Sequence, residues 1–400
     1  MTSFSVAPLY ERRKTPVADR RYSSGRHCIL QCSNSSTDVF VVGGGPAGLA
    51  AALAARKRGF DVTVADSCSP PIDKPCGEGL MPDGVAALGR LGVGIPPSDA
   101  HRFHGIRFVS SGLQAEARFS QGSALGVRRT ELHRILIEHA ERAGVRLLWR
   151  SVVTGLHPDG ALVRGKLVRA RWVIGADGGD SRVRRWAGLD VHREKERRFA
   201  FRRHYRVAPW SRFMELHWGN RCQLFLTPVG PRELCLALLS SGPGLRLDGA
   251  LHEFPELSER LRGAERVSTE RGAVSVTRRL ARVCAGRVAL IGDASGGVDA
   301  ITGAGLSLAF TQAGLLGDCL ESGDLARYQA EHRALARRPA LMARALLLLE
   351  SHGRLRRRMM RAFVAEPELF AGLVAMHVGA ASSIDAAANG LALGWRLLRA

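Results

Sequence analysis

Residues 41–48 read Val-Val-Gly-Gly-Gly-Pro-Ala-Gly, and their glycines have the spacing of a dinucleotide-binding turn. Gly43 permits the tight turn, Gly45 lets the main chain approach a pyrophosphate, and Gly48 lets a helix and a strand pack closely. Unpaired N–H groups at the start of the following helix are expected to face the phosphates. The predicted cofactor contacts of this turn are Gly43, Gly45, Pro46, Ala47 and Gly48.

The segments on either side of the turn predict a βαβ unit. Residues 37–42 form a short β-rich run, and residues 49–60 form an alanine-rich helical stretch that ends near Gly59. Residues 61–66 predict a second strand that ends on Asp66. An acidic residue at this distance from the glycines is placed to bind the ribose hydroxyls of a dinucleotide. This unit alone fits either NAD or FAD.

Two later segments favour FAD. Residues 172–184, Trp-Val-Ile-Gly-Ala-Asp-Gly-Gly-Asp-Ser-Arg-Val-Arg, and residues 287–308 each run from an apolar strand into small residues. A flavin needs such segments because its ribityl chain and ring extend across the carboxyl edge of the sheet. A helix N-terminus at 303–305 would place N–H groups where the reduced ring carries negative charge. The predicted contacts here are Asp177, Gly178, Gly292, Asp293, Gly303, Ala304 and Gly305.

Together these three segments resemble the FAD signatures of the aromatic-hydroxylase fold (class A flavin monooxygenases) and of the related geranylgeranyl-reductase-like flavoproteins. The resemblance covers residues 37–325. Residues 127–136 are similar to the Val-x-Arg-x-x-Leu helix of this superfamily, which implies that Arg129 lies near the FAD phosphates. The sequence departs from the usual third signature at Ala300, where relatives carry proline, and at Ala304, where they often carry Glu or Gln.

The expected fold is therefore α/β, with a Rossmann-type FAD-binding domain, an inserted antiparallel β-sheet substrate domain and a helical C-terminus. The predicted parts are a disordered N-terminal extension (1–36), a discontinuous FAD-binding domain (37–104, 125–195 and 275–325), the substrate domain (105–124 and 196–274) and the helical segment (326–400).

Alternating residues in the substrate domain predict hairpins. Residues 105–119 read as a hairpin around Ser111–Gly112, and residues 214–227 read as a strand, a turn and a strand. The alternation predicts that a single buried face of the sheet carries Met214, Leu216, Trp218, Cys222, Leu224 and Leu226. Such a sheet would cover the flavin with an apolar pocket for a hydrophobic small molecule.

A glycine-rich loop follows the second strand, in the segment Asp-Lys-Pro-Cys-Gly-Glu-Gly at 73–79. Prenyl reductases of the superfamily carry a similar Lys-Pro-Cys-Gly segment beside the flavin. The resemblance implies that Cys76, Gly77, Glu78 and Gly79 border the substrate pocket. Cys76 and Glu78 are the candidate catalytic residues, although a loop that only lets the main chain approach the ring would look the same.

Composition and charge limit which binding partners and which cellular compartment are expected. The net charge of +21 comes from arginines spread along the chain without interleaved aromatic residues, so no nucleic-acid partner is predicted. The eight cysteines show no CxxC pair and no zinc-ligand spacing, which predicts no metal site and a reducing, cytoplasmic location. The arginine-rich helical pattern at 326–362 would allow peripheral membrane contact.

The favoured function is an FAD-dependent oxidoreductase acting on a hydrophobic or aromatic small molecule. The resemblance implies a monooxygenase working through a flavin C4a-hydroperoxide, with NADH or NADPH as a transient reductant, since the chain has no second dinucleotide fingerprint. The alternative is a geranylgeranyl or polyene reductase that delivers hydride to a carbon–carbon double bond. The loop at 73–79 favours this reductase, whereas the Leu-Phe-Leu-Thr-Pro-Val-Gly at 224–230 lacks the Tyr-x-Trp-x-Phe-Pro run of such enzymes.

Overall fold

The computed structural model describes residues 36–380, apart from the side chains of residues 192–196. The predicted N-terminal extension, except Ser36, and residues 381–400 of the predicted helical segment lie outside the described residues. Among residues 36–380, every helix is too short or too polar to cross a membrane.

The first sheet is the predicted dinucleotide-binding sheet. Its path runs β18-β19-β11-β1-β2-β8, and β1 pairs in parallel with both β11 and β2. Its strands are β1 (Ser36–Val42), β2 (Val62–Ala65), β8 (Arg146–Leu148), β9 (Val153–His157), β10 (Gly160–Val163), β11 (Lys166–Gly175), β18 (Cys284–Ala285) and β19 (Val288–Leu290). The parallel strands end at one edge, so the three glycine-rich segments that follow β1, β11 and β19 are brought together there.

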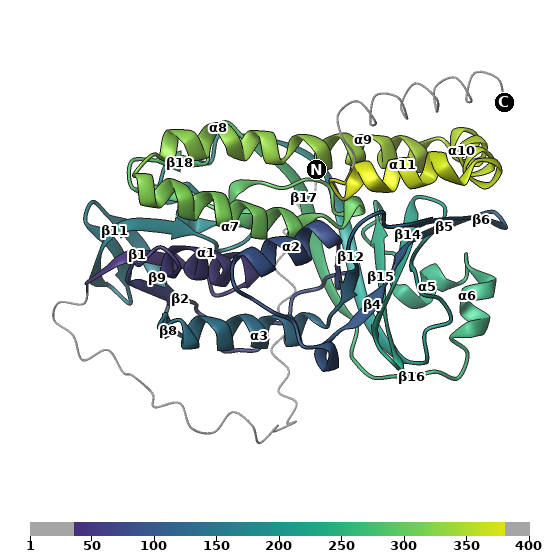
Figure 1. Cartoon of the computed structure of the whole chain (residues 1–400), viewed down its shortest axis with the longest axis horizontal. Coiled ribbons are helices and arrows are strands. Elements are labelled where there is room, and N and C mark those ends of the chain that lie inside the picture. Colours follow the sequence, from purple (N-terminus) through teal and green to yellow (C-terminus); the bar gives the residue numbers. More distant parts are fainter. Residues whose placement is uncertain (1–35, 381–400) are drawn as a thin grey trace, which may run out of the picture. The chain divides into compact units, whose positions relative to one another are not determined.

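Helices accompany this sheet, and α1 packs on both α3 and α7 (Figure 1). Their bounds are α1 (Pro46–Arg56), α2 (Pro82–Arg90), α3 (Arg129–Arg142), α4 (Arg182–Trp186), α7 (Gly305–Ser322) and α8 (Leu325–Leu335). Three 3-10 turns lie at Pro97–Asp99 (η1), Gly292–Ser295 (η2) and Ala300–Thr302 (η3). The alanines of α1 allow close approach, and this helix is buried along most of its length.

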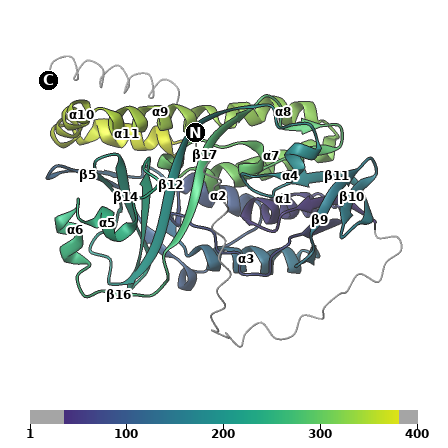
Figure 2. The same ribbon diagram turned by 180° about the vertical axis from the view of Figure 1, so that it is seen from behind.

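The second sheet is the predicted substrate sheet, with the path β16-β12-β15-β14-β13-β5-β6 and β17 paired with β12. Figure 2 shows β12 and β17 as two long neighbouring strands. Its strands are β5 (Gly105–Ser110), β6 (Leu113–Arg118), β12 (His192–Arg206), β13 (Met214–Trp218), β14 (Cys222–Gly230), β15 (Glu233–Ser240), β16 (Glu265–Arg266) and β17 (Arg271–Leu280). The predicted boundaries after residues 195 and 274 fall inside β12 and β17, which belong wholly to this sheet.

A small sheet and two groups of helices complete the fold. The small sheet joins β3 (Gly79–Leu80), β7 (Ala124–Gly126) and β4 (His101–Phe103). The helices are α5 (Leu247–Leu251), α6 (Pro255–Arg260), α9 (Arg337–Ser351), α10 (Gly353–Ala365) and α11 (Pro367–His377). Residues of α9, α10 and α11 form one core with β5 and β13, whereas α5 and α6 form a second core with β14 and β15.

The prediction of a single buried face on the substrate sheet is wrong. Leu216 lies opposite Phe225 and shares its face, so Leu224 and Leu226 point to the other side. Three residues connect β13 to β14, and Arg221 among them has a φ of 60°. This connection shifts the alternation by one position, so the sheet buries apolar side chains on both faces.

Candidate functional site

In the turn after β1, Gly43 and Gly48 have no room for a side chain. Gly43 has a φ of 111°, and a Cβ there would lie 2.4 Å from the carbonyl oxygen of Ala176. A Cβ on Gly48 would lie 1.9 Å from the carbonyl oxygen of Gly43. Gly45 caps α1, which begins at Pro46. The first and second predicted signatures therefore touch through their main chains, as a dinucleotide cradle requires.

Two side chains fix this turn from outside. The carboxylate of Asp66 accepts hydrogen bonds from the N–H groups of Gly44 and Cys68, both at 2.7 Å. His133, fully buried on α3, lies 2.8 Å from the Gly44 carbonyl through Nε2 and accepts the N–H of Ile72 through Nδ1. Burial lowers the pKa of His133, against the opposing hydrogen bond to Gly44, so the ring is neutral at pH 7.

The second signature keeps an unused acceptor. Oδ2 of Asp177 accepts the N–H groups of Arg182 and Val183 at 2.7 and 3.2 Å, while Oδ1 is buried without a hydrogen-bond partner. Gly178 has a φ of 82°. The buried Arg184 donates to the carbonyl oxygens of Gly179 and Ala294 at 2.8 and 3.2 Å. Arg184 therefore ties the second signature to the third.

The third signature lies beside the first. A Cβ on Gly292 would lie 2.7 Å from the Cβ of Ala47, and its N–H donates to Gln312 at 2.9 Å. Asp293 forms an ion pair with Lys74 at 2.7 Å, and the Lys74 charge holds the Asp293 pKa below its usual range. The helix α7 begins at Gly305, after Ala304 as its N-cap and Gly303 in a left-handed conformation.

These groups fit an FAD molecule. Arg129 begins α3, and its positive charge also lowers the pKa of Asp293, which places it near the third signature. Its Nε is buried without a hydrogen-bond partner, like Oδ1 of Asp177. An extended dinucleotide would supply partners to both atoms, because it offers phosphate oxygens and ribose hydroxyls. The individual contacts of the predicted cofactor residues remain predictions.

The carboxylate of Glu78 anchors the loop at 73–79. This residue is 2 % exposed and has a φ of 59°. Its Oε1 accepts the N–H of Arg129 at 2.9 Å, and its Oε2 lies 2.7 Å from Nε2 of His204 on β12. The loop is also anchored through the Gly77 carbonyl, which accepts the hydroxyl of Thr227 at 2.6 Å. Both oxygens of the Glu78 carboxylate are therefore used to hold the loop in place.

Cys76 is half-buried in the same loop, and its Sγ accepts the N–H of Glu78 at 3.4 Å. Gly79 closes the loop at the start of β3, where a Cβ would lie 3.2 Å from the sulfur of Met214. The loop therefore reaches the substrate sheet, and its place at the border of the substrate pocket remains a prediction. A chemical role for Cys76 remains a prediction.

Glu78, His204 and Cys235 bring their side-chain ligand atoms within 4.8 Å of one another, which resembles a metal site. Nδ1 of His204 is contacted by guanidinium groups of Arg202 and Arg128 at 3.1 and 3.3 Å, and these charges oppose a cation. Burial raises the pKa of the Cys235 thiol well above its usual value, which disfavours the thiolate that zinc prefers. The cluster is best described as a hydrogen-bond network.

An apolar pocket lies between the substrate sheet and the C-terminal helices. It encloses about 420 Å³, including its mouth open to solvent. It is lined by Ile106, Phe108, Met214, Leu216, Phe225, Ile301, Thr302, Met342, Leu346, Phe370, Leu373, Val374 and His377. Ile301 and Thr302 belong to η3, directly before the N-terminus of α7. The pocket therefore adjoins the place predicted for the reactive end of the flavin.

Comparison with known proteins agrees with this geometry. The family described as an FAD binding domain matches residues 36–219. Menaquinone reductase of Mycobacterium tuberculosis (strain ATCC 25618 / H37Rv) is 33 % identical over 329 residues, covering 74 % of this chain and 79 % of the relative. The chain belongs to the family of FAD-dependent oxidoreductases that includes this reductase.

Two further similar proteins share less sequence with this chain. Digeranylgeranylglycerophospholipid reductase 1 of Methanothermobacter thermautotrophicus is 28 % identical, covering 68 % of this chain and 74 % of the relative. The geranylgeranyl bacteriochlorophyll reductase-like structure from Thermoplasma acidophilum superposes with a TM-score of 0.67 at 21 % identity, covering 77 % of this chain and 86 % of that one. The predicted fold class and the predicted superfamily are confirmed.

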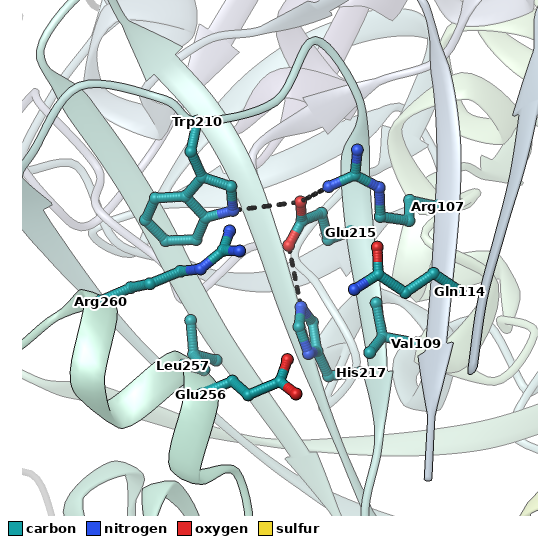
Figure 3. A pocket seen from close by; sticks show the side chains of 9 residues that line it. All are labelled: Arg107, Val109, Gln114, Trp210, Glu215, His217, Glu256, Leu257 and Arg260. Atoms are coloured by element: carbon teal, nitrogen blue, oxygen red, sulfur yellow. Dashed lines mark hydrogen bonds and ion pairs between the residues drawn. The ribbon is translucent and has the colours of Figure 1, made fainter. Parts of the chain in front are cut away.

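A second, polar pocket of this flavoenzyme lies on the opposite face of β13 (Figure 3). At its centre, Glu215 accepts hydrogen bonds from Arg107 at 2.6 Å and from Nε1 of Trp210 at 3.2 Å. Its other oxygen lies 2.9 Å from Nε2 of His217. Both oxygens of the carboxylate are satisfied within the protein, so Glu215 itself has little left to offer a ligand.

Three side chains were missed by the sequence analysis. His133 stands four residues after Arg129 on the same helix face, a spacing that could have placed it beside the glycine turn. His204 stands two residues after Arg202 in a period-two strand, which could have indicated a shared face. His377 lies among small and apolar residues, and nothing in its local pattern points to a pocket.

Proposed function

We propose that this flavoenzyme reduces a carbon–carbon double bond in a hydrophobic lipid of the isoprenoid type. The observation that carries the proposal is the 33 % identity to a menaquinone reductase across three quarters of the chain. Digeranylgeranylglycerophospholipid reductases are further relatives, which supports a prenyl-lipid substrate. Bound FAD would supply a hydride to the double bond, with NADH or NADPH as the proposed source of electrons.

The residues of the chain have three tasks in this proposal. The apolar lining of the pocket binds the hydrocarbon and excludes water from the reacting atoms. The Glu78–His204 pair fixes the loop at 73–79, so that its main chain stays close to the pocket wall at Met214. Ile301 and Thr302 connect the pocket to the start of α7, so substrate and cofactor share one wall.

Hydroxylation of a hydrophobic molecule is the second candidate. It is favoured by residues 224–230, which lack the aromatic Tyr-x-Trp-x-Phe-Pro run of many prenyl reductases. In the structure this segment lies on β14, where Phe225 is its contribution to the apolar pocket. A pocket lined with aliphatic and aromatic side chains would hold an aromatic ring as well as a prenyl chain.

Product analysis distinguishes the two reactions. The FAD-loaded protein would be incubated with NADH or NADPH and a prenylated naphthoquinone, with and without oxygen, and the lipid analysed by mass spectrometry. We expect a product that forms without oxygen and that, after the quinone ring is reoxidised in air, still carries two additional hydrogen atoms in its prenyl chain. A product that gains one oxygen atom, and forms only in air, would replace the reductase by the monooxygenase.

A matched pair of glycine variants links the product to the dinucleotide turn. In Gly48→Ala the new Cβ would lie 1.9 Å from the Gly43 carbonyl oxygen, so FAD content and product should be lost together. Gly89→Ala on α2 places its Cβ in open space and should retain both. Product formation by Gly48→Ala without bound FAD would contradict the assignment of this turn.

A further inference from the structure

A buried histidine on α8 adjoins the third FAD signature. His332 is in contact with Gln312 of α7 and with Ser295 of η2, and all three side chains are buried. Nε2 of His332 lies 3.0 Å from Nε2 of Gln312 and 2.9 Å from Oγ of Ser295. None of the three is a predicted cofactor contact, so a buried polar group of this kind calls for an explanation of its own.

Both neighbours of His332 bind the same glycine. Oε1 of Gln312 accepts the N–H of Gly292 at 2.9 Å, and the Ser295 hydroxyl donates to the Gly292 carbonyl at 2.8 Å. Gly292 has a φ of 60° and directly precedes Asp293, which is a predicted flavin contact. The carbonyl of Gly292 belongs to the peptide bond that leads to Asp293. The buried group therefore holds the main chain from which this carboxylate extends.

The tautomer of His332 follows from these contacts. Because Oε1 of Gln312 faces the Gly292 N–H, the NH2 of the same amide faces His332, and Nε2 of His332 must accept its hydrogen bond. Burial lowers the pKa of His332 to about 4, and the charge of Arg333 acts in the same direction, so the ring is neutral at pH 7. Its proton is then on Nδ1. Ser295 has a single hydroxyl proton, which the Gly292 carbonyl and Nε2 of His332 can both accept.

We propose that His332 is a positioning residue for FAD. Its Nε2 lone pair keeps the amide of Gln312 in the orientation that accepts the Gly292 N–H. Without this lone pair the amide can turn, and its NH2 group then opposes the Gly292 N–H. The main chain that leads to Asp293 loses its support as a result. Both candidate reactions use the same flavin, so the inference goes beyond the proposed function and does not depend on it.

Tyr328 separates this role from ordinary support of the fold. It precedes His332 by one turn of α8 and is fully buried, and the two ring centroids are 5.5 Å apart. Its hydroxyl donates to the carbonyl of Leu290 at 2.8 Å. Tyr328→Phe therefore removes one buried hydrogen bond made by the same helix, but it leaves the contact between Gln312 and Gly292 unchanged. It is the matched control for His332→Phe.

The affinity for FAD tests the inference without any substrate. The FAD-loaded full-length protein would be diluted, and the rise in flavin fluorescence on release would give the Kd. In His332→Phe we expect the Kd for FAD to rise about five- to tenfold, as for the loss of one buried hydrogen bond. In Tyr328→Phe the Kd should stay within about twofold, although urea unfolding at saturating FAD should show that both variants lose stability.

Two further variants examine the contact from either side. His332→Gln is the conservative rescue, because its side-chain oxygen can accept the hydrogen bond from Gln312, and its Kd should return to within about threefold of the unmodified protein. Gln312→Leu removes the acceptor of the Gly292 N–H and should raise the Kd at least as much as His332→Phe. Adding His332→Phe to Gln312→Leu should change the Kd by less than about twofold, since both act through one contact.

Several results would overturn the inference. They are a Kd of His332→Phe within about twofold of the unmodified protein, an equal loss of FAD affinity in Tyr328→Phe, no recovery in His332→Gln, and a full second loss in the double variant. If His332→Phe does not fold, Gln312→Leu and His332→Gln decide. A raised Kd in Gln312→Leu alone supports the inference, and an unchanged Kd in Gln312→Leu rejects it.

Discussion

The two faces of β13 carry pockets of opposite character. Met214 and Leu216 point to the apolar pocket beside the third FAD signature, whereas Glu215 and His217 point to the polar pocket of Figure 3. The strand alternates strictly, so one five-residue segment contributes to both. The polar pocket contains the more conspicuous charged groups, yet the Glu215 carboxylate at its centre is already paired with Arg107 and His217.

The difference shows that polarity alone is a poor guide to a binding site. A carboxylate that accepts several hydrogen bonds from its own protein has little left to offer a ligand. The apolar pocket has a single buried nitrogen without a partner, and it adjoins the FAD segments.

The largest expected effect is a loss of stability when the polar face of β13 is changed. Glu215→Ala leaves Arg107 and His217 without their buried partner, so the free energy of unfolding should fall by about 3–5 kcal/mol. Turnover per folded molecule should stay unchanged. Glu116→Ala, which removes the exposed partner of the same Arg107, should cost at most about 1 kcal/mol in urea unfolding. Lost turnover with intact stability would make the polar pocket functional.

A smaller stability effect with a larger functional one is expected on the other face. Phe225→Ala removes a partly buried ring from the apolar pocket, which should cost about 2 kcal/mol of unfolding free energy because the site is already open. The KM for a prenylated lipid should rise several-fold, since the lost ring is hydrocarbon contact. Unchanged KM in steady-state assays would argue that the substrate lies elsewhere.

The smallest expected effect is a difference in the pH range over which Glu215 and His377 change the stability of the protein. Burial raises the pKa of Glu215, but His217 and Arg107 outweigh this effect, so the net pKa is lowered. Ionised Glu215 therefore stabilises the folded protein fully above its ordinary pKa of 4.5, and this stabilisation is lost as the pH falls further. His377 is instead neutral when folded, with its pKa lowered from 6.5 to about 4, so it costs stability as the pH falls from 6.5 towards 4. In thermal unfolding, His377→Phe should lose less stability than the unmodified protein as the pH falls from 6.5 towards 4. Glu215→Gln should approach the stability of the unmodified protein only below pH 4.5. A common window for both variants would contradict this assignment.

Much of the dinucleotide site was predictable from sequence. The turn at Gly43–Gly48, the acid at Asp66 and the helix start at Gly305 follow from local rules about tight turns and helix termini. The hairpin of β5 and β6 was likewise predictable from alternation around Ser111–Gly112. These features depend on neighbours within a few residues, so a short window of sequence contains their causes.

The two pockets could not be predicted from any short stretch of the sequence. A three-residue connection moved Leu224 and Leu226 to the face opposite Leu216, because strand register decides which side each residue faces. Glu78 was predicted to border the substrate pocket, but His204, 126 residues later, engages its carboxylate. His377 reaches the apolar pocket only because α11 packs against β6 and against Phe108 of β5.

The sequence by itself determined the fold class and the FAD signatures, because glycine geometry and hydrophobic periodicity are local properties. Only the tertiary structure decided which face of the substrate sheet adjoins the cofactor segments and which buried polar atoms remain unpaired. Hydrogen-bond satisfaction is a property of the packed chain, since donors and acceptors meet across distant segments. Packing therefore decided that the Glu215 carboxylate is paired while Nδ1 of His377 is not.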